Sequence, residues 1–207
     1  MPRPPVCDIA VDVTALDRPI DPAAWFPAPA PLELEIGCGR GGFLVRVASE
    51  HPERHFVGIE WANKFHRYAA DRMARRGLTN VRVVRTDARQ FVIHRLVPAC
   101  LAALHVYHPD PWPKKRHHKR RLFCPEFVAA AIRALRPAAR LAIQTDHAEY
   151  FSVIESLLAG RAELQPVPFD DAHFGTLGER IETNYETKYL REGRAMHRLA
   201  FRKVAPA

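Results

Sequence analysis

The sequence contains no long apolar run and no closely spaced cysteine pair. No apolar stretch approaches the roughly 20 residues that a membrane-spanning helix needs. The first residues also lack the basic start and the continuous apolar core of a signal peptide. The four cysteines are far apart, which argues against a zinc ribbon or a disulfide framework. We therefore expect a cytoplasmic protein with no membrane contact and no metal site.

The composition favours one globular domain with a polyanionic partner. The 207 residues are enough for one α/β domain with a sizeable core, and 47% of them are apolar, too many for a chain that is disordered throughout. Lysine and arginine exceed the acids by 31 to 23, which gives a net charge of +8. This balance favours nucleic acid as a partner, and an anionic membrane surface less. The oligomeric state stays open, with a monomer slightly favoured.

The first 31 residues are rich in proline. Eight of the 18 prolines lie in residues 1–31, which show little apolar periodicity. This composition predicts an extended proline-rich arm without regular secondary structure. Residues 32–207 then form the single folded domain.

A strand, a glycine turn, a helix and a second strand follow the arm. Leu32 to Ile36 is typical of a short strand, and residues 37–42 contain four glycines. A helical pattern follows, and His55 to Glu60 is the next strand candidate. This order predicts a βαβ unit whose glycines let a ligand approach the backbone near a helix N-terminus.

The glycine motif alone does not identify the ligand. Gly37, Gly39 and Gly42 satisfy Gly-x-Gly-x-x-Gly, and Glu60 stands where a ribose-binding acid belongs, so a nicotinamide dehydrogenase is formally open. Glu35, however, precedes the glycines at a point where an acid can meet a cationic ligand rather than a pyrophosphate. No later segment is typical of a hydride-transfer site, whereas a basic segment further along the chain is typical of a nucleic-acid site.

Acidic residues follow several predicted strands. Further strands are predicted at 81–85, 101–107, 140–144, 161–169 and 196–203, with helices between most of them, a loop at 170–178 and a helix at 183–192. An acid stands at or just past the carboxyl end of five strands: Glu35, Glu60, Asp87, Asp110 and Asp146. Because ligands of open α/β sheets bind at that edge, we expect the five acids to surround one site.

The segment 108–121 has two halves of opposite character. Its first half alternates three prolines with Asp110 and Trp112, and each proline pushes the preceding residue towards extended geometry. Its second half, Lys114 to Arg121, holds six Lys/Arg and two adjacent histidines, a poor spacing for joint metal ligation. The pattern is typical either of a stiff turn followed by a solvated charge run, or of a catalytic acid beside a phosphate-binding surface. Trp112 is equally suited to stack on a base or to anchor the loop.

Together these motifs resemble a known family. The residues that carry the resemblance span nearly the whole chain after the arm: Glu35–Gly39, Gly58–Glu60, Asp87–Ala88, Pro109–Lys115, His118–Arg121, Thr145–Asp146 and Thr183–Glu186. They resemble the class I S-adenosylmethionine-dependent methyltransferases, specifically the bacterial tRNA (guanine-N7)-methyltransferase family. The Pro-Asp-Pro-Trp-Pro-Lys segment is highly specific for this family. The chain departs from the family pattern at His108, where a phenylalanine usually stands, and at Ala138-Ala139, where Gly-Gly is common.

The resemblance implies a fold and a reaction. The fold would be the doubly wound, Rossmann-like α/β fold of class I methyltransferases, with a mostly parallel seven-stranded sheet, an antiparallel last strand and helices on both faces. Residues 32–207 would form the methyltransferase domain. It would transfer a methyl group from S-adenosyl-L-methionine to N7 of a guanosine in the variable loop of tRNA and release S-adenosyl-L-homocysteine. The alternatives are a methyltransferase for another acceptor and a non-catalytic tRNA-binding module of the same fold.

The resemblance also assigns roles to residues. Asp110 would be the catalytic acid. The cofactor would be bound by Glu35, Gly37, Gly39, Glu60, Asp87, Ala88 and Asp110. The target guanosine would be held by Lys114, Asp146, Thr183, Asn184, Tyr185 and Glu186. The RNA would be contacted by Arg116, His117, His118, Lys119, Arg120 and Arg121.

Overall fold

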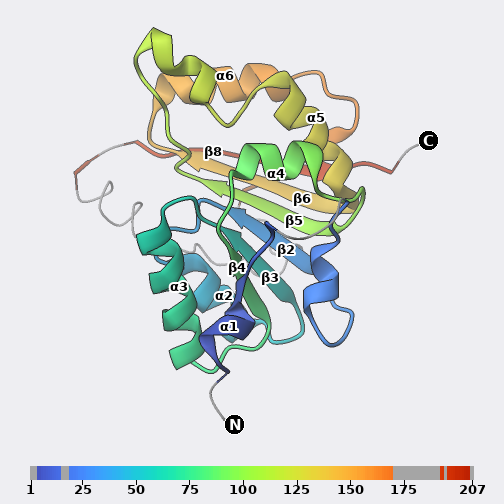
Figure 1. Cartoon of the computed structure of the whole chain (residues 1–207). Coiled ribbons are helices and arrows are strands. Elements are labelled where there is room, and N and C mark those ends of the chain that lie inside the picture. Colours follow the sequence, from blue (N-terminus) through green and yellow to red (C-terminus); the bar gives the residue numbers. More distant parts are fainter. Residues whose placement is uncertain (1–3, 15–18, 170–191, 194, 206–207) are drawn as a thin grey trace.

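A single eight-stranded sheet organises the part of the chain that the structure describes (Figure 1). The computed structural model describes residues 4–14, 19–169, 192–193 and 195–205. The strands are β1 (Ala10–Val11), β2 (Leu32–Ile36), β3 (His55–Ile59), β4 (Val81–Val84), β5 (Leu101–Tyr107), β6 (Leu135–Thr145), β7 (Leu164–Val167) and β8 (His197–Lys203). Their order across the sheet is β1-β4-β3-β2-β5-β6-β8-β7.

Most of the sheet is parallel. The strands from β1 to β6 pair in parallel, and β8 is antiparallel to both of its neighbours, β6 and β7. The predicted mostly parallel sheet with an antiparallel last strand is therefore confirmed. The sheet has one strand more than the seven predicted, because β1 from the N-terminal segment pairs with β4. All five positions of β2 and of β3 are buried, as expected for central strands covered on both faces.

Helices cover both faces of the sheet, as predicted (Figure 1). One face carries α1 (Val6–Ile9), α2 (Gly42–Glu50) and α3 (Asn63–Arg75), and the other carries α4 (Ala88–His94), α5 (Pro125–Ala134) and α6 (Ala148–Leu158). Two apolar cores result, one on each face. Successive strand residues point to opposite faces, so Phe56 packs in the core with Met73 of α3, whereas Val57 packs in the core with Phe127 of α5.

The N-terminal segment is folded rather than extended. The sequence predicts an arm without regular structure over residues 1–31, but the described part of it forms α1, β1 and a 3-10 turn, η1 (Pro22–Trp25). Ile9 is fully buried, and the Phe26 ring stacks on His55 with centroids 3.9 Å apart. This prediction was wrong because the apolar residues are spaced irregularly among prolines and follow neither a helical nor a strand period. A domain boundary at residue 31 stays a prediction.

β6 begins earlier than the predicted strand at 140–144. It starts at Leu135, and its register against β5 shifts between Leu101 and Ala103. Ala138 lies in the shifted stretch and has a φ of +62°. The residue that replaces the common glycine of the family pattern thus adopts a left-handed conformation that favours glycine.

The C-terminal third is described only in part. The strand predicted at 161–169 is shortened to β7, and the strand predicted at 196–203 is confirmed as β8. The predicted loop at 170–178 and most of the predicted helix at 183–192 lie outside the described residues. Among the described helices, none combines the length and the apolar character needed to cross a membrane.

Candidate active site

The predicted acids follow strands that end at one edge of the sheet. β2, β3, β4, β5 and β6 are parallel neighbours in the sheet, so their carboxyl ends lie at the same edge. Glu35 lies in β2, and Glu60, Asp87, Asp110 and Asp146 come shortly after β3, β4, β5 and β6. This is the edge at which ligands of open α/β folds bind.

Main-chain hydrogen bonds fix the glycine turn against β3. The N–H groups of Gly37 and Cys38 donate to the Ile59 oxygen at 2.8 and 3.1 Å, and Gly39 N–H donates to Glu60 Oε2 at 2.9 Å. The φ angles of Gly37 (+77°) and Gly39 (+53°) are positive, a conformation that glycine adopts without a steric penalty. The turn therefore keeps one shape and presents its backbone at the sheet edge.

Gly58 lets helix α2 pack close to the turn. A Cβ atom at this position would lie 2.4 Å from Leu44 Cδ1 and 2.9 Å from Cys38 Sγ, closer than real Cβ contacts allow. In the sequence, Gly58 stands out only as part of a family motif. The structure shows that its missing side chain makes room for the helix and the turn.

Glu35 is a buried carboxylate with an unused oxygen. Its side chain is 5% exposed, and Oε2 has no hydrogen-bond partner. Burial, and then the charge of Glu60, raises the pKa of Glu35 to about 8. A buried carboxylate of this kind is stabilised by a cation that also donates hydrogen bonds.

The carboxylates of Glu60 and Asp87 both accept hydrogen bonds from main-chain N–H groups. Besides Gly39, Glu60 accepts a hydrogen bond from Ala62 N–H through Oε1 at 2.7 Å, immediately before α3 begins. Asp87 is exposed and caps α4, whose first residue is Ala88, by accepting from Gln90 N–H at 3.0 Å. Each carboxylate therefore stabilises a helix start, and each retains lone pairs for a ligand.

Asp110 is exposed in the proline-rich loop. It makes no hydrogen bond or ion pair with any other residue that the structure describes. His108 and Trp112, two residues away on either side, have positive φ angles of +51° and +42° although each precedes a proline. The prediction of extended geometry before the prolines is therefore wrong at these two positions. Positive φ in a non-glycine residue persists where the surrounding contacts determine it.

The basic segment packs around Trp112. The Arg120 guanidinium lies 5.0 Å from the centroid of the indole ring, and the His117 ring packs edge-on at 5.8 Å. Trp112 is half-buried by these contacts. They agree with Trp112 as an anchor of the loop, one of the two roles that the sequence leaves open.

Arg121 is used inside the protein. Its side chain is only 5% exposed, and its Nη1 and Nη2 donate to the two Glu149 oxygens at 3.0 and 2.5 Å. Its Nε donates to the Pro111 oxygen at 2.8 Å, and its guanidinium lies 4.7 Å from the centroid of the Tyr150 ring. The hydrogen bond from Arg121 lowers the pKa of Glu149. Arg121 thus ties the loop to α6. The sequence predicts that Arg121 contacts RNA, but its guanidinium is buried against α6.

The other cations of the segment remain at the surface. They lie on a 3-10 helix, η2 (Lys115–Arg120), which Lys114 precedes. The exposed residues are Lys114, Lys115, Arg116, Lys119 and Arg120, and His117 and His118 are half-buried. Arg89 of α4 donates to the Lys119 main-chain oxygen at 2.9 Å, which holds η2 in place. No acidic residue occurs within η2.

A polar chain that the sequence analysis missed joins the ends of β5, β6 and β8. His108 N–H donates to the Gln144 oxygen at 2.7 Å, His108 Nε2 lies 3.1 Å from Gln144 Nε2, and His108 Nδ1 lies 3.4 Å from Asp146 Oδ1. Arg198 Nε donates to Gln144 Oε1 at 2.7 Å. Since the Gln144 amide nitrogen can only donate, His108 Nε2 accepts, and the proton of a neutral ring lies on Nδ1 facing Asp146. The one sequence signal was the departure of His108 from the family pattern.

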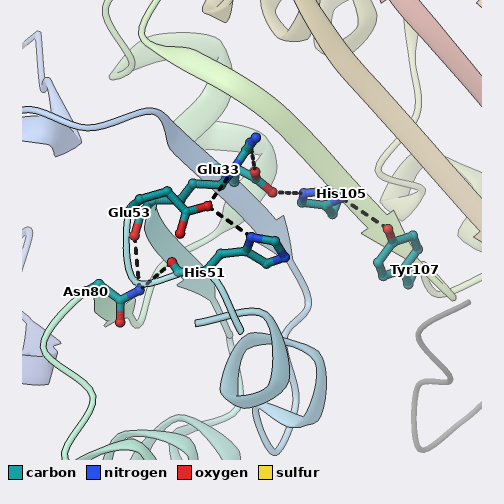
Figure 2. Close-up of polar contacts among 7 residues, drawn as sticks. Glu33, His51, Glu53, Asn80, His105 and Tyr107 are labelled. Carbon is teal, nitrogen blue, oxygen red and sulfur yellow. Dashed lines mark hydrogen bonds and ion pairs between the residues drawn. The ribbon is translucent and has the colours of Figure 1, made fainter. Parts of the chain in front are cut away.

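A second polar chain lies deeper, between β2 and β5 (Figure 2). Glu33 accepts from Arg54 Nη1 at 2.7 Å, and its other oxygen lies 2.8 Å from His105 Nε2. His105 Nδ1 in turn lies 3.1 Å from the Tyr107 hydroxyl. Burial raises the pKa of Glu33, but the hydrogen bonds and charges of His105 and Arg54 outweigh burial and lower the pKa overall. Both nitrogens of His105 have protein partners, so this histidine belongs to the core.

The predicted guanosine-binding residues Thr183, Asn184, Tyr185 and Glu186 lie outside the described residues. Within the described ranges, no three His, Cys, Asp or Glu side chains are grouped so that they could hold a metal ion.

The chain matches other methyltransferases over most of its length. A family model described as “Putative methyltransferase” matches residues 29–199. The tRNA (guanine-N(7)-)-methyltransferase of Geobacter metallireducens is 35% identical over 92% of this chain and 90% of that protein. The protein of the same name from Bordetella pertussis is 38% identical over 90% of this chain and 73% of that protein.

Solved structures share the fold at lower identity. The antibiotic-resistance methyltransferase Kmr aligns with a TM-score of 0.57 and 15% identity, over 87% of this chain and 90% of that chain. TrmN from Thermus thermophilus aligns with a TM-score of 0.59 and 17% identity, over 85% of this chain and 45% of that chain. These likenesses establish the class I methyltransferase fold. The family match and the relatives at 35% and 38% identity establish more: the chain belongs to the tRNA (guanine-N(7)-)-methyltransferase family.

Proposed function

We propose that this protein transfers a methyl group from S-adenosyl-L-methionine to N7 of a guanosine in the variable loop of tRNA. The products are 7-methylguanosine and S-adenosyl-L-homocysteine, and the reaction takes place in the cytoplasm. One observation carries the proposal: three features meet at one sheet edge. They are a buried carboxylate with an unused oxygen near the end of β2, an exposed carboxylate after β5 without a partner among the described residues, and a basic 3-10 helix that follows it. Glu35 suits a cationic cofactor, Asp110 suits the reacting base, and η2 suits RNA phosphates. The shared name of the relatives supports the same reaction.

The residues of the edge fit S-adenosyl-L-methionine. The unused oxygen of Glu35 is buried, and the ammonium group of this cofactor can donate a hydrogen bond to it. Open space lies beside Gly37, where no atom comes within 4 Å of a built Cβ, so a ligand can approach the backbone of the turn. When bound, the cofactor supplies a methyl group attached to a positively charged sulfur.

The neighbouring strand ends would hold the rest of the cofactor. Glu60 has lone pairs left after its two main-chain hydrogen bonds and would accept from the ribose hydroxyls. Asp87 and Ala88, at the start of α4, would border the purine. Gly39 would contribute backbone contact, and Asp110, after β5, would contact the cofactor on the side that faces the substrate.

The chemistry asks mainly for positioning. N7 of guanine has a free lone pair, so no proton has to be removed from the nucleophile. Holding the base in line with the methyl group at about 3 to 3.5 Å can lower the activation barrier by roughly 7–11 kcal/mol. The guanine ring gains positive charge as the bond forms, and the carboxylate of Asp110 would stabilise that charge or accept a hydrogen bond from the base.

Substrate binding would divide between base and backbone. Lys114 and Asp146 would hold the guanosine, together with residues 183–186. The residues of η2 would contact the tRNA backbone: Arg116, His117, His118, Lys119 and Arg120. Such contacts are largely independent of sequence and weaken as salt is added.

The test is transfer of labelled methyl from S-adenosyl-L-methionine to unmodified tRNA, followed by digestion and nucleoside analysis. Label in 7-methylguanosine is the expected result. Label in another nucleoside would overturn the assignment of the base but retain the cofactor. Binding of S-adenosyl-L-homocysteine without any labelled tRNA would overturn the proposed substrate, and binding of tRNA without cofactor would indicate a non-catalytic module.

A further inference from the structure

The outer side of α3 carries a second group of positive charges. Lys64, Arg67 and Tyr68 are exposed there, and Arg40 of the glycine turn is exposed beside them. The Arg40 guanidinium lies 5.8 Å from the centroids of both the Phe65 and the Tyr68 rings. We call Arg40, Lys64, Arg67 and Tyr68 the α3 surface. It is separate from η2, which follows a different strand.

Lys64 and Arg67 are not engaged in ion pairs within the part of the chain that the structure describes. Lys64 lies in the first turn of α3, where the helix dipole favours a negative charge, and that turn contains no acid. The single acid of α3, Asp71, pairs with Arg75 at 2.9 Å further along the helix. Neither Lys64 nor Arg67 forms an ion pair with a carboxylate among the described residues. Cations that are unpaired, and in one case opposed to the dipole, are available for a partner outside the chain.

The aromatic residue of the α3 surface indicates the kind of partner. Tyr68 is 46% exposed, and the Arg40 guanidinium lies near its ring. Exposed aromatic rings interleaved with cations are typical of surfaces that bind nucleic acid, where cations contact phosphates and rings contact sugars or bases. The opposite side of α3 is apolar and buried, with Ala69 and Met73 fully covered, so the helix cannot turn this surface away.

The α3 surface is fixed relative to the glycine turn. One carboxylate, Glu60, accepts from Gly39 in the turn and from Ala62 at the helix start. Arg72 of α3 also donates to the main-chain oxygen of Arg40 at 3.3 Å. RNA bound on this surface would therefore keep a constant position relative to the methyl donor.

The α3 surface and η2 lie on either side of the glycine turn. β2 leads into the turn and lies between β3, which precedes α3, and β5, which precedes η2. β3 and β5 are two strand spacings apart, about 10 Å. Both basic regions thus follow strands that flank β2, on opposite faces of the sheet, and an RNA molecule that reaches the turn from this edge would meet both. We propose that the α3 surface binds the sugar-phosphate backbone of the RNA substrate as a second anchor, an inference that rests on the proposed tRNA substrate.

The test is a double variant, Lys64→Gln with Arg67→Gln, in the full-length protein. Its dissociation constant for unmodified tRNA should rise about tenfold at 0.1 M salt, and the log–log salt slope should become shallower by about two. The dissociation constant for S-adenosyl-L-homocysteine and kcat at saturating tRNA should stay unchanged. The melting temperature should not fall, because Lys64 opposes the helix dipole, so weaker tRNA binding cannot be attributed to a damaged fold.

The matched control is Arg75→Gln with Arg76→Gln. It removes the same charge from the last residue of α3 and from its C-cap, at the end that points away from the glycine turn. The control should change tRNA affinity less than about twofold. Equal weakening by the two double variants would overturn the proposal, because net charge alone would then explain the effect. Loss of binding to vesicles of anionic phospholipid, with tRNA binding unchanged, would overturn it in favour of a membrane surface.

The same experiment separates this proposal from the proposed function. If the native protein binds tRNA but forms no 7-methylguanosine, the proposed function is wrong. Comparing the tRNA affinities of the two double variants then still shows whether the α3 surface binds RNA. If the native protein does not bind tRNA, both proposals fall. If it forms 7-methylguanosine and the two double variants behave alike, only the α3 surface is wrong.

Discussion

The imidazole Nδ1 of His108 faces Oδ1 of Asp146 at 3.4 Å. The side chains are 5% and 16% exposed, so water competes little for the contact. On its other side the ring is held by Gln144, which Arg198 holds in turn. His108 thereby positions the carboxylate that is proposed to hold the target guanosine.

Replacing His108 with phenylalanine should raise KM for tRNA. The phenyl ring fills the space, but it cannot donate to Asp146 and leaves the Gln144 amide without its acceptor. The loss should lower kcat/KM about tenfold, as expected for a hydrogen bond to a carboxylate, and leave the affinity for S-adenosyl-L-homocysteine unchanged. Steady-state kinetics with limiting tRNA measures this. His108→Gln keeps one donor and one acceptor and should recover part of the loss, and unchanged kcat/KM in the phenylalanine variant would contradict the positioning role.

Glu35 should make cofactor binding depend on pH. Its pKa of about 8 means that the carboxyl is mostly protonated at pH 7 in the free protein. A cationic ligand favours the ionised form and lowers this pKa, so binding below pH 8 releases a proton. The affinity for S-adenosyl-L-methionine should therefore rise between about pH 6 and pH 8, by at most tenfold per unit, and then level off.

Calorimetry of cofactor binding in buffers of different ionisation enthalpy measures how many protons are released per ligand bound. At pH 7 the native protein should release close to one proton per ligand bound by way of Glu35, and Glu35→Gln should lack this release. The ligand's own titration is common to both proteins and cancels in the comparison. Equal release by the two proteins would show that Glu35 does not exchange a proton on binding.

The sheet and its ligand edge could be predicted because their signals are local. Leu32–Ile36 and His55–Ile59 each form a short apolar run next to a turn signal, and the acids that follow the strands are visible in the same few residues. Strand order then brings these ends together without further information. The class of fold and the position of the site therefore follow from short stretches of sequence.

Contacts between distant residues could not be predicted in this way. Arg120 and Arg121 are neighbours in a run of cations, yet only Arg121 is buried, because Glu149, 28 residues later, lies where it can accept two hydrogen bonds. The burial of Phe26 could likewise not be predicted from its proline-rich surroundings, because Phe26 stacks on the ring of His55, which lies in another element. In each case the decisive partner belongs to another element, which no local pattern shows.

Arg121 and Lys119 should separate stability from RNA binding. Arg121→Gln removes buried hydrogen bonds to Glu149 and to the Pro111 oxygen, so it should lower the melting temperature by about 5 °C. Lys119→Gln removes an exposed charge, so it should leave the melting temperature unchanged and make the salt slope of tRNA binding shallower by about one. Thermal unfolding and tRNA binding between about 50 and 200 mM salt measure the two effects. The assignment would be reversed if Lys119→Gln lowered the melting temperature and Arg121→Gln only changed the salt slope.

Asp110→Asn should lower turnover far more than cofactor affinity. Asparagine keeps the shape of the side chain and removes the charge that is proposed to stabilise the methylated guanine ring. The expected loss is about 100-fold in kcat, typical for removal of one group that stabilises developing charge, with the dissociation constant for S-adenosyl-L-homocysteine changed less than about twofold. Single-turnover kinetics with saturating tRNA and calorimetry with S-adenosyl-L-homocysteine give the two numbers. The control is Asp71→Asn. It makes the same change of charge on α3, within the pair of Asp71 and Arg75, and it should leave kcat intact.

Equal losses in turnover and in cofactor affinity for Asp110→Asn would show that Asp110 mainly binds the cofactor. The stabilisation of charge on the base would then have to come from another residue.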